Sequence, residues 1–150
     1  MKPICTRRKI LQGLLALAGM ALMPLQLFAR NGAAFNATGA DEAMRALFGD
    51  KSVTASEKVR LKAPDIAENG AVVPVTVTAD IEGVQSISLV VVENPNPLSA
   101  RFNLAPGGVP DISTRIKMGK SSEVIAAVET QSGVYTASTD IKVTIGGCGG

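Results

Sequence analysis

Beyond residue 52, apolar positions recur with a period of two, which is the pattern of half-buried β-strands. In the run AVVPVTVTAD, Val73, Val75 and Val77 alternate with smaller or polar residues. About seven segments of this kind are separated by turns rich in Gly, Pro and Asn. They are EKVRLKAP (57–64), AVVPVTVTAD (71–80), VQSISLVVVEN (84–94), ARFNLAP (100–106), DISTRIKMG (111–119), SEVIAAVET (122–130) and GVYTASTDIKVTI (133–145).

Short strands without repeating helices predict an all-β domain over residues 53–145. The expected architecture is an immunoglobulin-like antiparallel β-sandwich. The Cys–Trp–Cys signature of antibody domains is absent, because the chain has no Trp. The similarity to immunoglobulin domains therefore concerns architecture alone.

Two segments depart from simple alternation. Pro74 interrupts a valine-rich run and cannot donate a ladder hydrogen bond, which predicts an edge or bulged strand. The apolar run ISLVVVEN (87–94) predicts a strand that is buried on both faces. Its second face is covered either by another chain or by the domain's own core, and the sequence leaves both alternatives open.

One short helix is expected in the segment 30–52. Thr38 stands three residues before Asp41, which is a helix-start pattern. Met44, Leu47 and Phe48 share one helical face. The helix is expected to end at about residue 51, after a stop signal at Gly49.

The first 29 residues have the layout of a signal peptide. A basic start leads through the pair Arg7–Arg8 into an uncharged run that contains Pro24 and ends at Ala29. A twin-arginine pair in this position predicts export to the periplasm by the Tat pathway. The run of 20 residues could instead span a bilayer as an anchor. Cleavage after Ala34 is an alternative to cleavage after Ala29.

Composition excludes several kinds of active site. The chain has no His and only two Cys, so neither a histidine-based catalytic triad nor a histidine or thiolate metal cage can form. Without the four basic residues of the first nine positions, the 15 basic residues fall to 11, against 13 acidic ones. A slightly acidic domain lacks the basic surface of a nucleic-acid-binding protein. We therefore expect a protein without metal or cofactor that is not itself an enzyme.

The chain ends on GGCGG, which places Cys148 between two pairs of flexible glycines. Removal of the leader would take Cys5 with it and leave Cys148 as the only thiol in an oxidising compartment. No cation stands closer in sequence than Lys142, so a partner must activate this thiol. What the glycines provide is access to a narrow active site. The surrounding glycines are Gly146, Gly147, Gly149 and Gly150.

Three interpretations of this tail remain open. Cys148 carries a covalently attached substrate between enzymes, or it forms an intermolecular disulfide in an exported structural module. The third interpretation makes Gly149–Gly150 the reactive end, as in sulfur carriers that use a C-terminal thiocarboxylate. Those proteins have a ubiquitin-like fold, which fits a β-sandwich poorly.

Four stretches carry a resemblance to a known family. The twin-arginine leader, IAENGAVVPVTVTAD, ENPNPLSARFNL and the terminal GGCGG are together similar to SoxY, the sulfur-carrier family of the periplasmic Sox system of thiosulfate oxidation. The resemblance covers the chain from about residue 41 to residue 150, and GGCGG is its most specific part.

The resemblance implies a mechanism at Cys148. In that family the haem protein SoxAX joins thiosulfate oxidatively to the tail cysteine, which gives a cysteine S-thiosulfonate. SoxB then releases sulfate and leaves a persulfide, and SoxCD oxidises the remaining outer sulfur. The family also forms a heterodimer with SoxZ. Our hypothesis for residues 146–150 is a swinging arm, with Gly146 and Gly147 as the hinge and Gly149 and Gly150 keeping the tip narrow.

Overall fold

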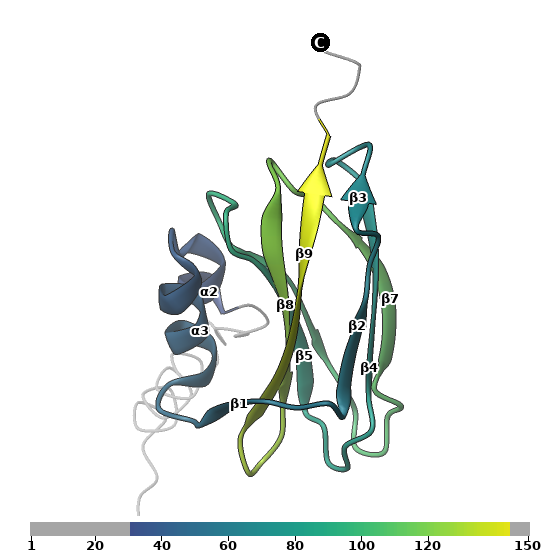
Figure 1. Ribbon diagram of the computed structural model, residues 1–150. Coiled ribbons are helices and arrows are strands. Elements are labelled where there is room, and N and C mark those ends of the chain that lie inside the picture. Colours follow the sequence, from purple (N-terminus) through teal and green to yellow (C-terminus); the bar gives the residue numbers. More distant parts are fainter. Residues whose placement is uncertain (1–30, 145–150) are drawn as a thin grey trace, which may run out of the picture. The chain divides into compact units, whose positions relative to one another are not determined.

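Two β-sheets pack face to face in the computed structural model, which describes residues 31–144 (Figure 1). The larger sheet has the strand order β1-β9-β8-β5-β6, with β3 added to β9, and the smaller sheet has the order β2-β4-β7. The strands are β1 (Val53–Ala55), β2 (Val59–Lys62), β3 (Ile66–Ala67), β4 (Val73–Ala79), β5 (Ser86–Val91), β6 (Leu98–Asn103), β7 (Asp111–Ile116), β8 (Ser122–Glu129) and β9 (Val134–Val143). The prediction of an all-β, immunoglobulin-like sandwich is confirmed.

All seven predicted strands are present, and two further strands were missed. β1 and β3 pair with β9 in parallel, so the sandwich is not antiparallel throughout. β1 has three residues and β3 has two. Segments this short show no recognisable alternation, and they are extended because β9 offers an edge to pair with.

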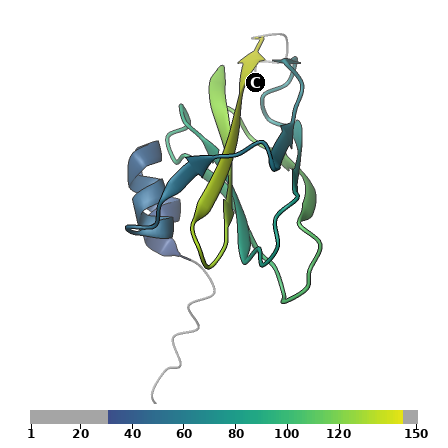
Figure 2. The same cartoon turned by 60° about the horizontal axis from the view of Figure 1, so that its bottom comes forward.

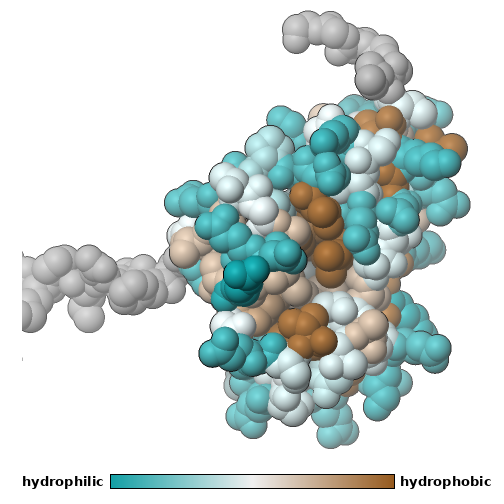
Figure 3. Space-filling view, turned by 60° about the vertical axis from the view of Figure 1, so that its left-hand side comes forward, coloured by the Kyte–Doolittle hydropathy of each residue, from teal (hydrophilic) through white to brown (hydrophobic). Residues whose placement is uncertain are grey.

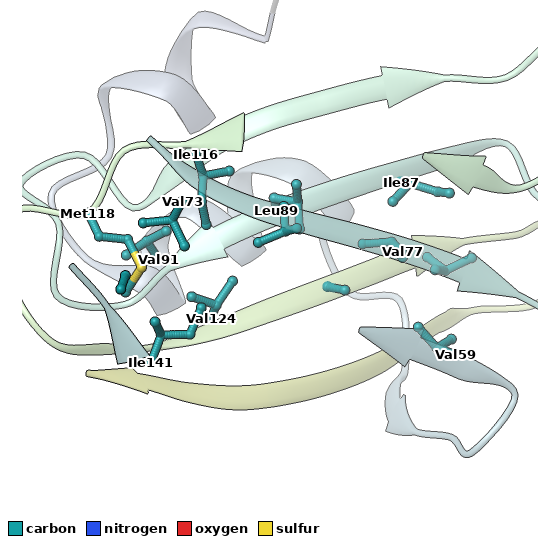
Figure 4. Close-up of a cluster of buried hydrophobic side chains, with 14 residues drawn as sticks. Val59, Val73, Val77, Ile87, Leu89, Val91, Ile116, Met118, Val124 and Ile141 are labelled. Carbon is teal, nitrogen blue, oxygen red and sulfur yellow. The ribbon is translucent and has the colours of Figure 1, made fainter. Parts of the chain in front are cut away.

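The interior is built mainly from branched aliphatic side chains of both sheets (Figure 4). Along β4, Val73, Val75 and Val77 are buried and the intervening residues face outward. Ile87 and Leu89 of β5 meet them from the larger sheet. The period of two read from the sequence is therefore the inward and outward alternation of real strands.

β5 is buried on both faces, as its apolar run predicted. Its outer face packs against helices of the same chain, since Val90 lies in a cluster with Ala34 and Ala43. Figure 2 shows the helices on the outside of one sheet, away from the sandwich interior. The alternative in which another chain covers this strand is wrong for Val90, because the N-terminal segment already covers it.

β4 is the central strand of the smaller sheet, so the prediction of an edge strand at Pro74 is wrong. Pro74 faces Arg115 of β7, whereas the pairing of β4 with β2 extends only to Thr76. No strand on the β2 side therefore requires an N–H from Pro74. The physical argument about proline holds at this residue but not for the whole strand.

The N-terminal segment forms two helices, α2 (Gly32–Asn36) and α3 (Ala40–Phe48). α3 ends at Phe48, three residues earlier than predicted, and is followed by Gly49, whose φ of 59° favours glycine. Thr38 does not cap α3 with its side chain; its backbone N–H donates to Glu42 Oε2 at 3.0 Å. α2 was not predicted. Neither helix of residues 31–144 is long and apolar enough to cross a membrane.

Candidate functional site

The residues predicted to carry the function lie outside the described part of the chain. Cys148, Gly146, Gly147, Gly149 and Gly150 all follow Thr144, the last described residue. What the structure describes is the strand from which they continue. β9 reaches Val143, with β3 beside its C-terminal end (Figure 1).

The end of β9 is held along both of its edges. On one edge, Lys142 N–H donates to Asp65 O at 2.9 Å and Thr144 N–H donates to Ala67 O at 3.1 Å. On the other edge, pairing with β8 stops at Ile141, and Ser121 Oγ then accepts a hydrogen bond from Val143 N–H at 2.9 Å. The backbone is therefore held in place up to Thr144, the last described residue.

Gly70 packs directly against this anchor. Its carbonyl accepts a hydrogen bond from Met118 N–H at 2.7 Å. A Cβ at this position would lie 2.4 Å from Met118 O and 2.9 Å from Val143 Cγ1. The sequence indicated only a turn at Asn69–Gly70, and the close approach to β9 could not be read from it.

The length of the tail limits where the thiol can act. Cys148 is the fourth residue after Thr144, so the Cα of Cys148 lies within about 14 Å of the Cα of Thr144. We call the part of the sandwich around Thr144, formed by residues 65–72, 117–121 and 141–144, the tail end. Any reaction at Cys148 takes place beside this surface.

The tail end combines apolar and charged side chains. Ile66 and Val72 are 57% and 49% exposed and supply its apolar surface. Lys142 is exposed and paired with Ile66, and Asp65 and Glu68 are exposed on either side of β3. Among residues 31–144, no group of His, Cys, Asp and Glu side chains is placed to hold a metal ion.

A second polar cluster surrounds Glu129. Lys51 Nζ lies 2.7 Å from Oε1, Arg101 Nη2 lies 2.7 Å from Oε2, and Ser86 Oγ donates to Oε2 at 2.8 Å. Burial raises the pKa of Glu129, but the hydrogen bonds from Lys51 and Ser86 and the charges of Arg101 and Lys51 outweigh it, so the pKa is lowered. Arg101 also lies over the ring of Phe48 at 5.8 Å. The cluster ties α3 to the larger sheet and is structural.

A hollow of about 770 Å³ opens at the other end of the sandwich. The turns around Gly83, Gly107 and Ser132 line it. Ser132 lies before the ten-residue strand β9, and Thr144 lies after it. A strand of this length spans about 33 Å, so the chain's own tail does not reach the hollow.

Comparison with known proteins identifies the family. The family of sulfur oxidation protein SoxY matches residues 44–148. The solved structure of the sulfur carrier protein SoxY from Chlorobium limicola f thiosulfatophilum is 39% identical, with a TM-score of 0.64, over 70% of this chain and 96% of that one.

A superoxide reductase (neelaredoxin) from Ignicoccus hospitalis is 22% identical, with a TM-score of 0.53, over 59% of this chain and 81% of that one. At this identity it shares the fold alone. A search of curated proteins gives no significant match. The match over residues 44–148 covers all strands of the sandwich and extends to Cys148. This chain therefore belongs to the SoxY family of sulfur oxidation proteins.

Proposed function

We propose that this protein is a sulfur carrier that holds thiosulfate-derived intermediates covalently on the thiol of Cys148. The observation that carries the proposal is the family match, which ends on Cys148. Similarity to a sulfur carrier protein at 39% identity supports the same role. The chain presents the substrate and the partner enzymes perform the chemistry.

The anchoring of β9 suits a carrier. The backbone is held on both edges up to Thr144, and a short glycine-rich stretch follows. Gly146 and Gly147 provide rotation, and Gly149 and Gly150 add no side-chain bulk at the tip. The thiol can thus enter a narrow channel while the sandwich remains outside as a rigid body.

The proposed chemistry balances with partners of known class. Loading joins the Cys148 sulfur to the outer sulfur of thiosulfate, releases the thiol proton and passes two electrons to the haem protein SoxAX. Hydrolysis by SoxB then adds water, releases sulfate and leaves a persulfide on Cys148. SoxCD oxidises the outer sulfur of that persulfide to a sulfonate, which takes three oxygen atoms from water and passes six electrons to SoxCD, so that a second hydrolysis releases sulfate and restores the thiol.

The proposal includes a location and a stable partner. The leader over residues 1–29 directs the folded protein to the periplasm by the Tat pathway. SoxZ accompanies it as a heterodimer partner. No metal or cofactor takes part on this chain, and the covalent adducts on Cys148 are its cargo.

Mass spectrometry of the C-terminal peptide after growth on thiosulfate tests the proposal. We expect additions of sulfur and of thiosulfonate on Cys148, and a Cys148→Ser strain that does not oxidise thiosulfate. The competing function is an intermolecular disulfide, which an exposed thiol can form. Cys148–Cys148 dimers without adducts, together with normal oxidation by Cys148→Ser, would replace the carrier proposal with that structural role.

A further inference from the structure

The short tail brings partner enzymes against a defined surface. This inference rests on the proposed function, in which enzymes act on Cys148. The thiol stays within reach of Thr144, so the rim of an enzyme's channel must come close to the tail end of the sandwich. The surfaces that border the tail end therefore determine how an enzyme binds and how it is oriented.

One bordering surface is the outer face of the β2–β4–β7 sheet. Residues that alternate with the buried valines of β4 form this face, and its register is known. Lys62 faces Thr76 of β4, which in turn faces Ser113 of β7. The next row toward the tail end pairs Pro74 with Arg115. All of these side chains are exposed or half-buried.

Most cations of this face lie toward the tail end, whereas Arg60 lies at the opposite end, in the row of Thr78 and Asp111. Lys62 is the last residue of β2, and Arg115 is the penultimate residue of β7. Lys117 is exposed between buried Ile116 and Met118, so it continues the outward alternation. Asp111 is the acidic residue in the strands of this face, and it lies at the opposite end of β7.

These cations have no evident role in holding the chain's own fold. Within residues 31–144, the ion pairs involve Lys51, Arg101 and Lys120, and neither Lys62 nor Arg115 forms one. Like charges gathered on one face repel each other, so the arrangement does not stabilise the isolated domain. An acidic surface placed against it would relieve that repulsion.

Other surfaces near the tail end carry mixed or acidic charge. Asp65 and Glu68 are exposed on the loop beside β3. On the larger sheet, Glu123 and Asp140 face each other in the register of β8 and β9. On these surfaces the carboxylates outnumber the cations, which are Lys142 and the ion-paired Lys120, whereas the smaller sheet presents Lys62, Arg115 and Lys117 toward the tail.

We propose that the outer face of the β2–β4–β7 sheet, around Lys62, Arg115 and Lys117, is the docking face for the enzymes that act on Cys148. To fit this face, such an enzyme must carry acidic side chains beside the mouth of its channel. The helices lie on the other side of the molecule and leave this face free (Figure 1). Complementary charge orients each enzyme so that its channel faces the tail, and it accelerates encounter more than it tightens the final complex.

The test uses the charge-reversed variant Lys62→Glu/Arg115→Glu in the full chain with its partner subunit. We measure kcat/KM for loading of thiosulfate by the purified haem enzyme at several salt concentrations. At low salt the value should fall by about tenfold, and the difference should shrink at high salt because screening weakens surface charge. Arg45→Glu, an exposed charge change on α3, is the matched control and should alter loading little.

Two measurements separate docking from other effects. Iodoacetamide should alkylate Cys148 at equal rates in all variants, which shows that the thiol itself is unchanged. Equal kcat/KM in the double variant and in Arg45→Glu overturns the docking face, as does alkylation slowed in parallel with loading. If the wild type takes no adduct at all, the proposed function fails instead. Lys62→Gln/Arg115→Gln replaces the double variant if the latter does not fold.

Discussion

Glu129 shows how one buried carboxylate can connect three separate elements. It accepts from Lys51, Ser86 and Arg101, which belong to the loop after α3 and to two strands of the larger sheet. A buried carboxylate is stable only when its charge is met by such partners. Their combined effect lowers the pKa of Glu129 in spite of burial.

Glu129→Gln should destabilise the domain at neutral pH. The folded pKa lies below the unfolded value, so ionised Glu129 contributes stability above the unfolded pKa, and this is lost as pH falls through the folded pKa. We expect a loss of about 1–3 kcal/mol at pH 7 and a weaker acid dependence. Denaturant unfolding at pH 7 and at acidic pH measures both. Glu123→Gln, exposed on the same strand, is the control, and equal stability of the two variants at pH 7 would contradict the role.

Gly70→Ala should disturb the root of the tail. The added Cβ would meet Met118 O at 2.4 Å and Val143 Cγ1 at 2.9 Å, and a backbone oxygen cannot move away cheaply. We expect a loss of about 1–3 kcal/mol in thermal or denaturant unfolding. Gly119→Ala is the matched control, since its Cβ would meet nothing closer than Asn94 Oδ1 at 3.8 Å. Equal stability of the two variants would argue against close packing at Gly70.

At the scale of elements, the sequence predicted those helices and strands that depend on local residue patterns. Seven strands follow from alternation, and the end of α3 follows closely from Gly49. The short parallel strands β1 and β3 depend on β9, which lies far from them in the sequence. The central position of β4 also depends on topology, because proline at residue 74 excludes a partner at one position and not along a whole strand.

The same division applies to the site. The tail cysteine and its glycines were predicted from composition and remain outside the described residues. The anchoring contacts of Thr144 and Val143 were not predicted, since they join β9 to Ala67 and Ser121 across long stretches of sequence. Pairings of this kind become visible only once the strands are placed.

Ser121→Ala should weaken the hydrogen bonding at the C-terminal end of β9, because it removes the acceptor of Val143 N–H. The hydroxyl accepts from Val143 N–H at 2.9 Å at the point where the β8 ladder has ended. Its loss should accelerate hydrogen exchange at the Val143 amide by about fivefold or more, which corresponds to about 1 kcal/mol. Ser138→Ala, also exposed and on β9, is the control. Unchanged exchange at Val143 would show that β3 alone fixes this end.

On the scale of the whole molecule, the two faces of the sandwich differ in what covers them. On the helix-bearing side, apolar side chains form a stripe in the middle and further groups above and below it, with polar side chains around them (Figure 3). The outer face of the β2–β4–β7 sheet carries no helix and presents cations toward the tail end. The N-terminal helices therefore cover the outer face of the larger sheet and leave the outer face of the smaller sheet without a helix. The larger sheet depends on intact helices, because they bury its outer apolar residues.

Whether the helices stay intact depends on where the proposed leader is cut. Asn31 caps α2 through its side chain, which accepts from Ala34 N–H at 3.2 Å and donates to Ala46 O at 2.7 Å. Ala34 itself is fully buried against the larger sheet. Cleavage after Ala34 would remove both, whereas cleavage after Ala29 leaves the helices whole.

The exported protein should therefore begin at Arg30. Intact-mass analysis of protein recovered from the periplasm gives its N-terminus directly. Asn31→Ala should lower stability by about 1 kcal/mol because it removes the cap of α2 and the bond to α3. A mature N-terminus at Phe35 would contradict the argument, since the chain would then have discarded a buried residue and its cap. Retention of the full precursor mass in a membrane fraction would favour the anchor instead.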